Sequence, residues 1–518
     1  MAKSTAYDYD GAKVFGHPAG LVYLFLTELW ASFALYGMQG ILVLFFVAQS
    51  TGVNPGFGWS NAEALALFGW YAMLIYVAAI PGGLLADRWL GQKRGALLGG
   101  AFLCLGLALM ALQWLGAFYA GLAGVVLGVG CLKPNITALV GGLYRPGDGQ
   151  RDVGFTLFYI GINIGTLLGT LLIGWIGTVY GWRLGFGLAG LGMLLGLLAF
   201  LLGNRYLAGI GEAPARPASG TEGALLRQAL RRRWPLAAAG AGALAGLYLL
   251  AQAQWGYGLL VIGSGAAIAL MIALFQNANP LERGRLLLLF LALLLITLFW
   301  SAFDQAEGLL NLYAQQKTDR MLGSFEVPAP WFLALNPFFI ILLGIPIGLF
   351  WLRLKKRGRE ASSIFKIAIG ILIMSGGFLL MRAAAVQYGL RGESAMYWLV
   401  LAYLFLTIGE LCASPVAMSL VTKLSPPRYG AILMGFYFAA IGLGNKLAGV
   451  LGELAQKTGE QAVFAATALG CAIAALLAIA FLRPLKALAQ GAEELPNTHF
   501  EETAGYELAD APEDWEED

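Results

Sequence analysis

The sequence predicts an all-α membrane protein that crosses the bilayer many times. Hydrophobic residues make up 59% of its 518 residues and charged residues only 12%, a balance that soluble globular domains of this size do not show. Apolar runs of about 20 residues recur along almost the whole chain, which is the length that a helix needs to cross a hydrocarbon core. Runs such as residues 286–299 do not alternate between apolar and polar residues, and this excludes a transmembrane β-barrel.

The first apolar run begins near Leu21, after a polar stretch of mixed charge. It is too long and too late to be a cleaved secretory signal, so we interpret it as the first membrane span. Runs of the same kind follow at short intervals. The expected spans are residues 21–47, 62–86, 95–115, 117–144, 153–178, 182–203, 234–252, 256–276, 285–315, 331–352, 363–383, 396–423, 429–452 and 461–482.

Basic residues gather in every second connection between these spans. Arg88, Lys93 and Arg94 lie between the second and third expected spans, and a dense basic run occupies residues 353–359, whereas the opposite connections hold few basic residues. Cytoplasmic loops of membrane proteins carry an excess of Lys and Arg. The pattern therefore predicts about fourteen spans with both termini in the cytoplasm.

Changes in composition divide the chain into segments. A polar stretch with Gly, Pro and basic residues follows the sixth span, and the next two spans hold hardly any charged side chain, so we expect two peripheral helices between two six-helix bundles. The end of the chain is acidic, which is typical of a soluble tail. The expected segments are 1–203 for the N-terminal bundle, 204–233 for a cytoplasmic linker, 234–283 for the extra helices, 284–484 for the C-terminal bundle and 485–518 for the tail.

Motifs for enzyme chemistry are absent from the sequence. It has two histidines, no P-loop, no nucleophile elbow and no paired metal ligands, and its four cysteines lack the spacing of a metal site or a disulfide framework. We therefore expect no enzyme activity, cofactor, metal or nucleic-acid partner. The class that remains is a secondary transporter, in which polar groups gather near the midplane between two bundles.

Several ionisable residues lie deep within the expected spans. An ionisable side chain in hydrocarbon is costly unless it is paired or hydrated, so each one is a candidate functional residue. Two carboxylate clusters and two lysines that face one cavity would form a pathway for a substrate and ions. These residues are Glu28, Lys133, Asp304, Glu307, Glu410 and Lys446.

The connection between the second and third expected spans reads GLLADRWLGQKR from Gly83 to Arg94. It resembles the signature loop of the major facilitator superfamily, in which glycines permit a tight turn and an acid-base pair closes the cytoplasmic side. The resemblance implies gating roles for Asp87, Arg88 and Arg94. The corresponding stretch of the second half, residues 348–359, keeps a glycine and the basic run but not the acid.

A series of motifs runs in order along nearly the whole chain. They are FGHP at 15–18, GCLKPNI at 130–136, FYIGINIG at 158–165, FWSAFDQ at 299–305, LNP at 335–337, GELCASP at 409–415 and GLGNKLAG at 442–449. Together they resemble the proton-dependent oligopeptide transporter family, whose most specific signature is the one at 158–165. Bacterial members of that family also carry two extra helices, so the resemblance implies a major facilitator fold of two six-helix bundles plus two helices between them.

What the resemblance implies is proton-driven uptake of di- and tripeptides by alternating access of the two bundles. A peptide is a zwitterion with amide edges, so its site needs a cation, an anion and amide groups. Lys133, Glu410 and the pair Asn163 and Asn336 supply one of each. The other substrate-binding candidates are Tyr36, Gln39, Tyr76, Trp300, Ser414 and Tyr437, of which the aromatic ones are also open to an interpretation as packing residues.

The first span departs from the ExxER pattern of the family. Glu28 keeps the first acid, but Ala31 and Ser32 stand where the second acid and the arginine are expected, and Gln39 stands in place of a later arginine. These changes leave proton coupling and carboxylate recognition open. Glu28 is either a proton-coupling residue or a hydrogen-bonded carboxyl group without a role in transport.

In the second half, we expect Asp304 and Glu307 to carry proton coupling. They are three residues apart, so on one helix face their carboxylates would repel each other, which favours a proton on one of them. Lys446 would neutralise this cluster as a charge partner, or else its side chain extends to the outer surface. Lys133 and Glu410 could also form a gating ion pair, which does not exclude substrate binding.

Three functions are compatible with the sequence. The first is a proton-coupled symporter of peptides or peptide-like molecules, and the second is a relative that moves another amine-bearing solute by uncoupled exchange or export. The third is a membrane scaffold that transports nothing, which the retained charges disfavour. The expected partners are a small peptide or peptide-like substrate, protons and the lipid bilayer. We expect a functional monomer in the bacterial cytoplasmic membrane.

Overall fold

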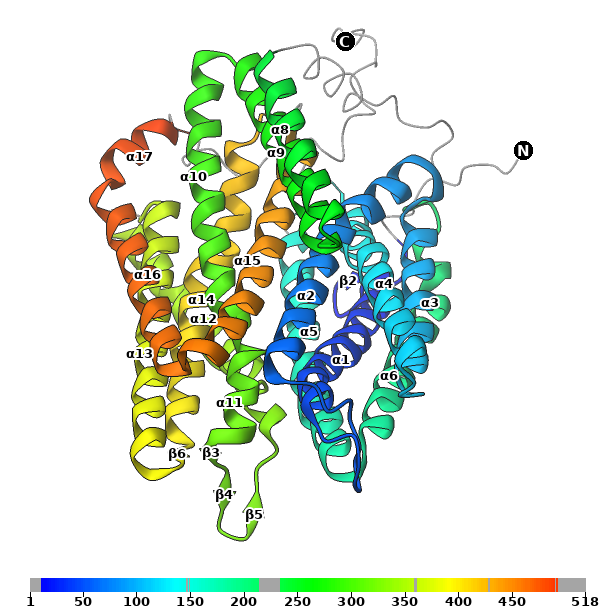
Figure 1. Cartoon of the computed structure of the whole chain (residues 1–518). Helices are drawn as coiled ribbons and strands as arrows, with labels where there is room; N and C mark the ends of the chain where they lie inside the picture. Colours follow the sequence, from blue (N-terminus) through cyan, green and yellow to red (C-terminus); the bar gives the residue numbers. More distant parts are fainter. Residues whose placement is uncertain are drawn as a thin grey trace, which may run out of the picture. The chain divides into compact units, whose positions relative to one another are not determined.

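The structure is a computed structural model that describes residues 11–145, 148, 150–213, 233–357, 361–426, 429–489 and 491. Residues 214–232 of the expected linker, and residues 490 and 492–518 of the expected tail, lie outside this described part. The described residues are mostly helical (Figure 1). The fourteen helices that are long and apolar enough to cross a membrane confirm the predicted all-α, multi-pass fold class.

Six long helices form the first half of the chain. These helices are only weakly amphipathic, because most of their residues face either other helices or lipid. The elements are β1 (Lys13–Val14), β2 (His17–Pro18), α1 (Ala19–Val47), α2 (Asn61–Leu85), η1 (Ala86–Leu90), α3 (Gln92–Met110), α4 (Leu115–Gly142), α5 (Gln150–Trp175), η2 (Ile176–Tyr180), α6 (Trp182–Gly203) and η3 (Asn204–Leu207).

The second half continues with the two middle helices and a further set of long helices. Its elements are α8 (Arg233–Ala251), α9 (Trp255–Asn277), α10 (Pro280–Phe303), η4 (Asp304–Ala306), α11 (Leu309–Lys317), β3 (Thr318–Asp319), β4 (Met321–Leu322), β5 (Phe325–Glu326), η5 (Ala329–Phe332), α12 (Leu335–Lys356), α13 (Ser363–Arg391), β6 (Ser394–Ala395), α14 (Tyr397–Leu424), α15 (Gly430–Thr458), α16 (Glu460–Ala480) and α17 (Leu482–Ala489). The antiparallel pair β4–β5 forms a short hairpin after α11 (Figure 1).

The chain divides into two compact units. The first comprises Met1–Pro217, Leu294–Ala417 and Phe438–Ala480, and the second comprises Ala218–Leu293, Met418–Tyr437 and Phe481–Asp518. The first unit therefore holds α1–α6, which we call the N-terminal bundle, together with the end of α10 from Leu294 and most of the chain from η4 to α16, which we call the C-terminal bundle. In the second unit, α8 and α9 pack so closely that a Cβ atom on Gly242 would lie 2.6 Å from the Cα atom of Gly265.

Small residues set the closest helix contacts of the N-terminal bundle. Gly161, Gly165 and Gly169 follow one another at four-residue intervals on α5, so they form one stripe along the helix. A side chain at Gly165 or Gly169 would collide with the backbone of α1. This stripe lets α1, which carries several of the predicted site residues, lie against α5.

One predicted span differs from the structure in a way that concerns the site. The sequence predicts a continuous helix over residues 285–315, and the structure shows α10 ending at Phe303, a 3-10 turn over Asp304–Ala306 and a new helix from Leu309. The prediction of one continuous α-helix through Asp304 and Glu307 is therefore wrong. Asp304 is the first residue of the tighter turn and Glu307 directly follows it, and side chains three apart in such a turn still lie above one another.

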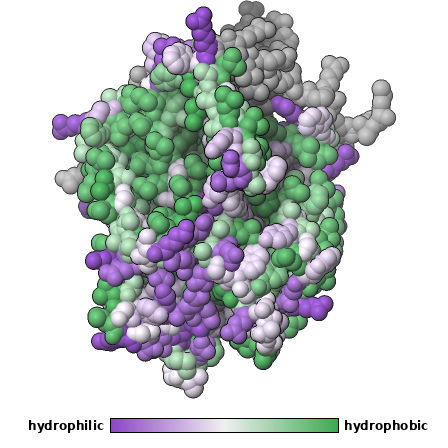
Figure 2. Space-filling model, viewed as in Figure 1, coloured by the Kyte–Doolittle hydropathy of each residue, from purple (hydrophilic) through white to green (hydrophobic). Residues whose placement is uncertain are grey.

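The hydropathy of the surface fits a membrane protein. Figure 2 shows hydrophobic residues over the flanks of the visible face, and hydrophilic residues gathered toward its lower part, above the β4–β5 hairpin. Figure 1 shows that hairpin and α11 at the same end. An apolar flank is what a lipid bilayer requires of a helical protein.

Candidate functional site

Lys133 and Tyr36 form the first part of the site. Lys133 on α4 donates a hydrogen bond of 3.1 Å to the hydroxyl oxygen of Tyr36 on α1, and its ammonium nitrogen lies 4.8 Å from the centroid of the Tyr36 ring. Lys133 also lies within electrostatic range of Glu28 and Glu307. Both side chains are partly exposed, so they remain accessible to a small solute.

Glu28 lies two turns before Tyr36 on the same helix and is buried, with 2% of its surface exposed. The hydroxyl group of Ser32 donates a hydrogen bond of 3.5 Å to its Oε1 atom, whereas its Oε2 atom has no hydrogen-bond partner among the described residues. Lys133 is the cation within electrostatic range of Glu28. Glu28 is therefore linked to the rest of the site chiefly through the charge of Lys133.

Asn336 and Glu410 form the second part of the site, in the C-terminal bundle. The amide nitrogen of Asn336, in the first turn of α12, donates hydrogen bonds of 2.7 Å to Oε2 of Glu410 and 3.2 Å to Oγ1 of Thr407. Glu410 and Thr407 lie one turn apart on α14. The tyrosine Tyr159 on α5 is within electrostatic range of both Glu410 and Tyr36, which connects this part with the first.

Asp304 and Glu307 form the third part, at the break between α10 and α11. The two carboxyl groups lie within electrostatic range of each other, and Lys133 of the N-terminal bundle is within range of Glu307. Asp304 is buried and its Oδ2 atom has no hydrogen-bond partner in the described part of the chain. The charged groups of the two bundles thus belong to one electrostatic network.

The remaining polar candidates are placed less decisively. Asn163 is buried and donates a hydrogen bond of 2.9 Å to the carbonyl oxygen of Tyr159, one turn earlier on α5. Gln39 is buried near the end of α1, and its side-chain oxygen has no partner among the residues described. Ser414 is partly exposed on α14, one turn after Glu410.

The aromatic candidates fall into two groups. Tyr76 on α2 and Trp300 on α10 belong to different bundles, and their ring centroids lie 6.4 Å apart. Both are partly exposed, as Tyr36 is, so they can contact a solute. Tyr437 belongs to the second unit and is 2% exposed within the structure.

Lys446 on α15 is buried and does not extend to the outer surface, so that alternative is wrong. Its ammonium nitrogen lies 3.7 Å from Oε1 of Glu453 on the same helix and 4.6 Å from the ring centroid of Trp70 on α2. The cation therefore contacts the N-terminal bundle while it pairs with an acid of the C-terminal bundle.

The loop that resembles the major facilitator signature lies at the end of α2. Asp87 and Arg88 fall in the π-helical turn η1, which is followed by Gly91 with a φ of 77°, a conformation that favours glycine. Arg94 is exposed in the first turn of α3. The neighbouring Lys93 forms an ion pair with Glu212 and a hydrogen bond of 3.3 Å with the carbonyl oxygen of Leu207.

Several contacts join the two bundles at the end of the first unit where α2 begins. Asn61 on α2 donates hydrogen bonds of 3.0 and 3.2 Å to the side-chain oxygens of Gln316 and Gln456. Nearby, a Cβ atom on Gly69 would lie 2.9 Å from the Cα atom of Gly449 on α15. We call this set of contacts the joined end.

Three further hydrogen bonds run from the C-terminal bundle to main-chain oxygen atoms of the N-terminal bundle. Asn311 donates to Gly40 at 2.9 Å, Trp331 donates to Leu171 at 3.0 Å and Asn445 donates to Ala72 at 3.4 Å. Together with Asn61, they tie α1, α2 and α5 to the C-terminal bundle.

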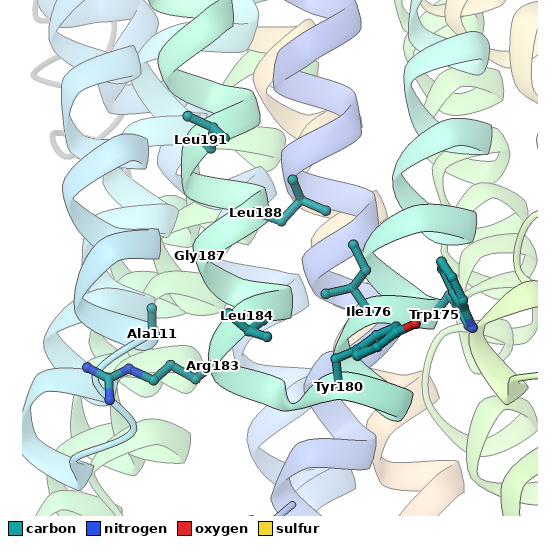
Figure 3. A pocket seen from close by; sticks show the side chains of 9 residues that line it. All are labelled: Ala111, Trp175, Ile176, Tyr180, Arg183, Leu184, Gly187, Leu188 and Leu191. Carbon is teal, nitrogen blue, oxygen red and sulfur yellow. The ribbon is translucent and has the colours of Figure 1, made fainter.

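A surface groove of about 730 Å³ lies apart from the charged network, along α5, η2 and α6 (Figure 3). Figure 3 shows the Tyr180 ring beside Trp175 and Arg183 pointing away from them. The centroids of the two aromatic rings lie 5.4 Å apart. The other lining side chains are mostly leucine, isoleucine and alanine. Aromatic residues beside a basic residue are typical of the bilayer interface, so we assign the groove to the lipid-facing surface.

Sequence reasoning missed several partners of the candidate residues. Thr407, Glu453 and Trp70 contact Asn336 or Lys446, and Tyr71 and Tyr403 lie within electrostatic range of Glu307. Thr407 lies one turn before Glu410 and Glu453 lies two turns after Lys446, so helical spacing was the signal that could have found them. In the described residues, no group of three or more His, Cys, Asp or Glu side chains is placed to hold a metal ion.

The chain shares sequence and structure with known transporters. The sequence profile of the POT family matches residues 94–469. The peptide transporter YePEPT of Yersinia enterocolitica is 37% identical, over 95% of this chain and 98% of that protein. A di-/tripeptide transporter of Lactococcus lactis is 31% identical, over 91% of this chain and 96% of that protein.

A solved structure agrees with this relationship. The crystal structure of a variant of the peptide transporter POT in complex with alafosfalin has a TM-score of 0.81 and 31% sequence identity, covering 92% of this chain and 97% of that one. This agreement confirms the predicted major facilitator fold, and the relatives are transporters, as the prediction against an enzyme expects. The chain belongs to the POT family of membrane transporters.

Proposed function

We propose that this protein takes up di- and tripeptides or peptide-like molecules together with protons, by alternating access of its two bundles. The observation that carries the proposal is the electrostatic network in which Lys133 of the N-terminal bundle interacts with Glu28 and Glu307. A transporter of zwitterions needs groups of both signs that belong to both bundles, because only then can binding of the solute influence how the bundles meet. The relatives whose names describe peptide transport support the same substrate class.

Each part of the network has a role in this proposal. Lys133 receives the peptide carboxylate, and Glu410, held by Asn336, receives the ammonium group. Glu28, Asp304 and Glu307 carry protons. Asn163, Gln39 and Ser414 contribute hydrogen bonds, and Tyr36, Tyr76 and Trp300 contribute aromatic surface for side chains.

The remaining assignments concern gating and location. Lys446 acts as a charge partner at the joined end, and Asp87, Arg88 and Arg94 act at the opposite end of α2. The protein works as a monomer in the bacterial cytoplasmic membrane, with both termini in the cytoplasm. The basic residues in alternate connections support this orientation, because positive loops remain on the cytoplasmic side.

Reconstitution tests the proposal directly. Radiolabelled dialanine is offered to proteoliposomes that contain the full chain, with and without an inward proton gradient, beside a counterflow assay that needs no gradient. We expect accumulation only with the gradient, and we expect Asp304→Asn and Glu307→Gln to abolish accumulation while counterflow continues. The exposed Glu393 provides the control, since Glu393→Gln removes a carboxylate far from any candidate residue in the sequence.

A second function rests on Ser32. Ser32 donates a hydrogen bond to Glu28 from a hydroxyl group, which is neutral. The cation within electrostatic range of Glu28 is Lys133, which also interacts with other groups of the site. If the gradient leaves dialanine flux unchanged while counterflow occurs, the protein is an exchanger that moves amine-bearing solutes without proton coupling.

A further inference from the structure

The groove along α5, η2 and α6 follows from a missing side chain on α6. Gly187 is exposed, and a Cβ atom there would meet nothing within 4 Å. Three residues later the helix is closed against α3, because a Cβ atom on Gly190 would lie 3.6 Å from the Cβ atom of Leu107. The groove of about 730 Å³ therefore includes a gap beside Gly187 that no side chain of the described residues fills.

The wall of the groove along α6 is made of leucine. Leu184, Leu188 and Leu191 lie three or four residues apart, so they share one face of the helix with Gly187. The side chains of Leu184 and Leu191 are 56% and 53% exposed. Figure 3 shows Leu188 and Leu191 farther from η2 than Leu184 is. This row offers an acyl chain an apolar surface about 10 Å long.

Arg183 supplies the charge at one end of the groove. It is the one charged residue between Asp152 and Arg205, and it is exposed. Its guanidinium group forms no ion pair or hydrogen bond with another residue of the described part. It also lies in one of the connections that hold few basic residues, where membrane proteins carry fewer cations. An anion that pairs with Arg183 therefore comes from water or from the membrane.

The corner between η2 and α6 is held in place by Asn54. The Asn54 side chain donates a hydrogen bond of 2.9 Å to the carbonyl oxygen of Gly177 and accepts one of 2.9 Å from the backbone N–H of Trp182. The indole N–H of Trp182 donates a hydrogen bond of 3.1 Å to the carbonyl oxygen of Asn54. Arg183 directly follows Trp182, so this end of the groove is preformed, which lowers the cost of binding a ligand.

Two aromatic residues place this end of the groove at the edge of the bilayer. The rings of Trp175 and Tyr180 meet edge to face, with an interplanar angle of 84°, and both residues line the groove. Trp and Tyr gather at the level of the lipid headgroups. Arg183 therefore lies at the level of the headgroups, and the row of leucines on α6 extends toward the hydrocarbon.

A phospholipid has its groups in the same order, with a phosphate followed by acyl chains. The guanidinium group of an arginine presents N–H donors in a planar fork that matches a phosphate. Among the described residues that line the groove none is acidic, so none repels a negative headgroup or attracts a positive one. A lipid with a net negative headgroup therefore fits better than a zwitterionic lipid, whose amine would lie near Arg183.

We propose that this groove binds one anionic phospholipid, with its phosphate on Arg183 and one acyl chain in the gap at Gly187 and along Leu188 and Leu191. The site belongs to the N-terminal bundle alone and lies apart from the charged network. It is therefore independent of the proposed cargo, and the lipid is a second ligand of the protein.

Lipid binding to the purified full-length protein tests the proposal. The protein is freed of lipid in a neutral detergent and titrated with dioleoyl-phosphatidylglycerol or with dioleoyl-phosphatidylcholine, and bound lipid is counted by native mass spectrometry. We expect the first phosphatidylglycerol to bind about fivefold more tightly than the first phosphatidylcholine, because one basic residue at a membrane surface contributes a factor of this size. An excess of inorganic phosphate is expected to leave the lipid bound, because phosphate does not use the apolar wall.

Two substitutions affect the two ends of the lipid differently. Arg183→Gln is expected to remove most of the preference between the lipids, and Arg183→Lys to keep part of it, because the charge decides between the headgroups. Gly187→Leu is expected to weaken both lipids alike, because the new side chain fills the gap, and its Cβ atom meets no neighbour that would disturb the fold. Arg391→Gln, at the exposed end of α13, is the matched control and is expected to keep the preference.

Equal binding of the two lipids by the unmodified protein would overturn the proposal, since the groove would then hold lipid of any kind. Displacement of the lipid by inorganic phosphate would also overturn it, because the site would then take free anions. The same holds if Arg183→Gln keeps the preference, or if Gly187→Leu binds both lipids as before. If the unmodified protein is a dimer that Gly187→Leu dissociates, a second copy covers the groove instead.

Discussion

Asn336 is the residue that fixes the acid of the C-terminal bundle. Its amide nitrogen donates to Glu410 at 2.7 Å and to Thr407 at 3.2 Å, so one side chain on α12 sets the position of two side chains on α14. A hydrogen bond to a charged group is stronger than one between neutral groups. The link to Glu410 is therefore the one that matters for binding an ammonium group.

We predict that Asn336→Leu raises the peptide KM by about tenfold or more, because a hydrogen bond to a charged group contributes about 1.5–3 kcal/mol. Thr407→Val removes only the weaker acceptor and is the matched control, for which we expect a change of less than about threefold. Initial rates of gradient-driven dialanine uptake give both values. Equal effects of the two substitutions would show that Asn336 acts through the packing of α12 and α14 instead.

The candidate residues and their partners differ in how readily sequence reveals them. Lys133 and Glu410 are visible in the sequence because charge is rare within apolar runs. Trp70 is not visible, because aromatic residues are common in spans and only helix rotation decides whether they face the site. The same reasoning applies to Lys446. The sequence predicts that Lys446 lies deep within a span, but it does not predict the contact of Lys446 with Trp70.

The crossing of α2 and α15 depends on two glycines. Gly69 and Gly449 face each other so closely that a Cβ atom on Gly69 would lie 2.9 Å from the Cα atom of the other glycine. Such a contact forces the backbones apart when either residue gains a side chain. Small residues at helix crossings are a general feature of membrane bundles, so this crossing is a weak point for larger side chains.

We predict that Gly69→Ala disfavours the contact between α2 and α15 by about 1 kcal/mol or more, the usual cost of overpacking, and slows transport about fivefold. Gly470→Ala on α16 is the control, since a Cβ atom there meets nothing within 4 Å. Uptake rates and thermal unfolding of both purified variants provide the comparison. Normal uptake by Gly69→Ala would mean that the two helices separate without cost.

The break at Asp304 shows what periodicity cannot reveal. Residues 285–300 are almost continuously apolar, but Asp304, Gln305 and Glu307 interrupt the pattern, and a single glycine, Gly308, follows the 3-10 turn over Asp304–Ala306. Polar residues of this kind also occur within continuous spans, so the pattern alone does not predict the break. The turn follows from contacts that form only in the folded bundle, such as the 3.2 Å hydrogen bond from Tyr403 to the carbonyl oxygen of Ala306. The identity of both acids was predictable, whereas their shared turn was not.

Alternating access requires the joined end to open. Asn61 bonds Gln316 and Gln456, and these side chains belong to three helices of both bundles. They must part when the two bundles separate at this end. A bond that prevents the separation should therefore stop transport without unfolding the protein.

We predict that the double variant Asn61→Cys with Gln316→Cys loses most uptake when treated with a short bifunctional thiol reagent, and regains it after the cross-link is cleaved. The single variants, treated in the same way, are the controls. Of the native cysteines, Cys131, Cys412 and Cys471 are buried, which limits side reactions. Full uptake by the cross-linked protein would contradict separation of the bundles at this end.

The architecture of the whole chain was largely predictable from sequence. The expected spans agree with the fourteen membrane-length helices to within a few residues at most ends, because hydrocarbon thickness sets their length. The end of the eleventh span is an exception: α13 continues to Arg391, whereas the expected span stops at 383. Which helices meet at the joined end was not predictable, since Asn61, Gln316 and Gln456 resemble ordinary surface residues in the sequence.

The hydrogen bonds from Asn311, Trp331 and Asn445 end on the main-chain oxygens of Gly40, Leu171 and Ala72. Every amino acid offers the same carbonyl group, so the accepting positions are free to drift during evolution while the donors are held. Mutational covariation between the two halves should therefore be weak at these three pairs, although they are in contact. It should concentrate at Asn61 with Gln316 and Gln456, where both partners use side chains.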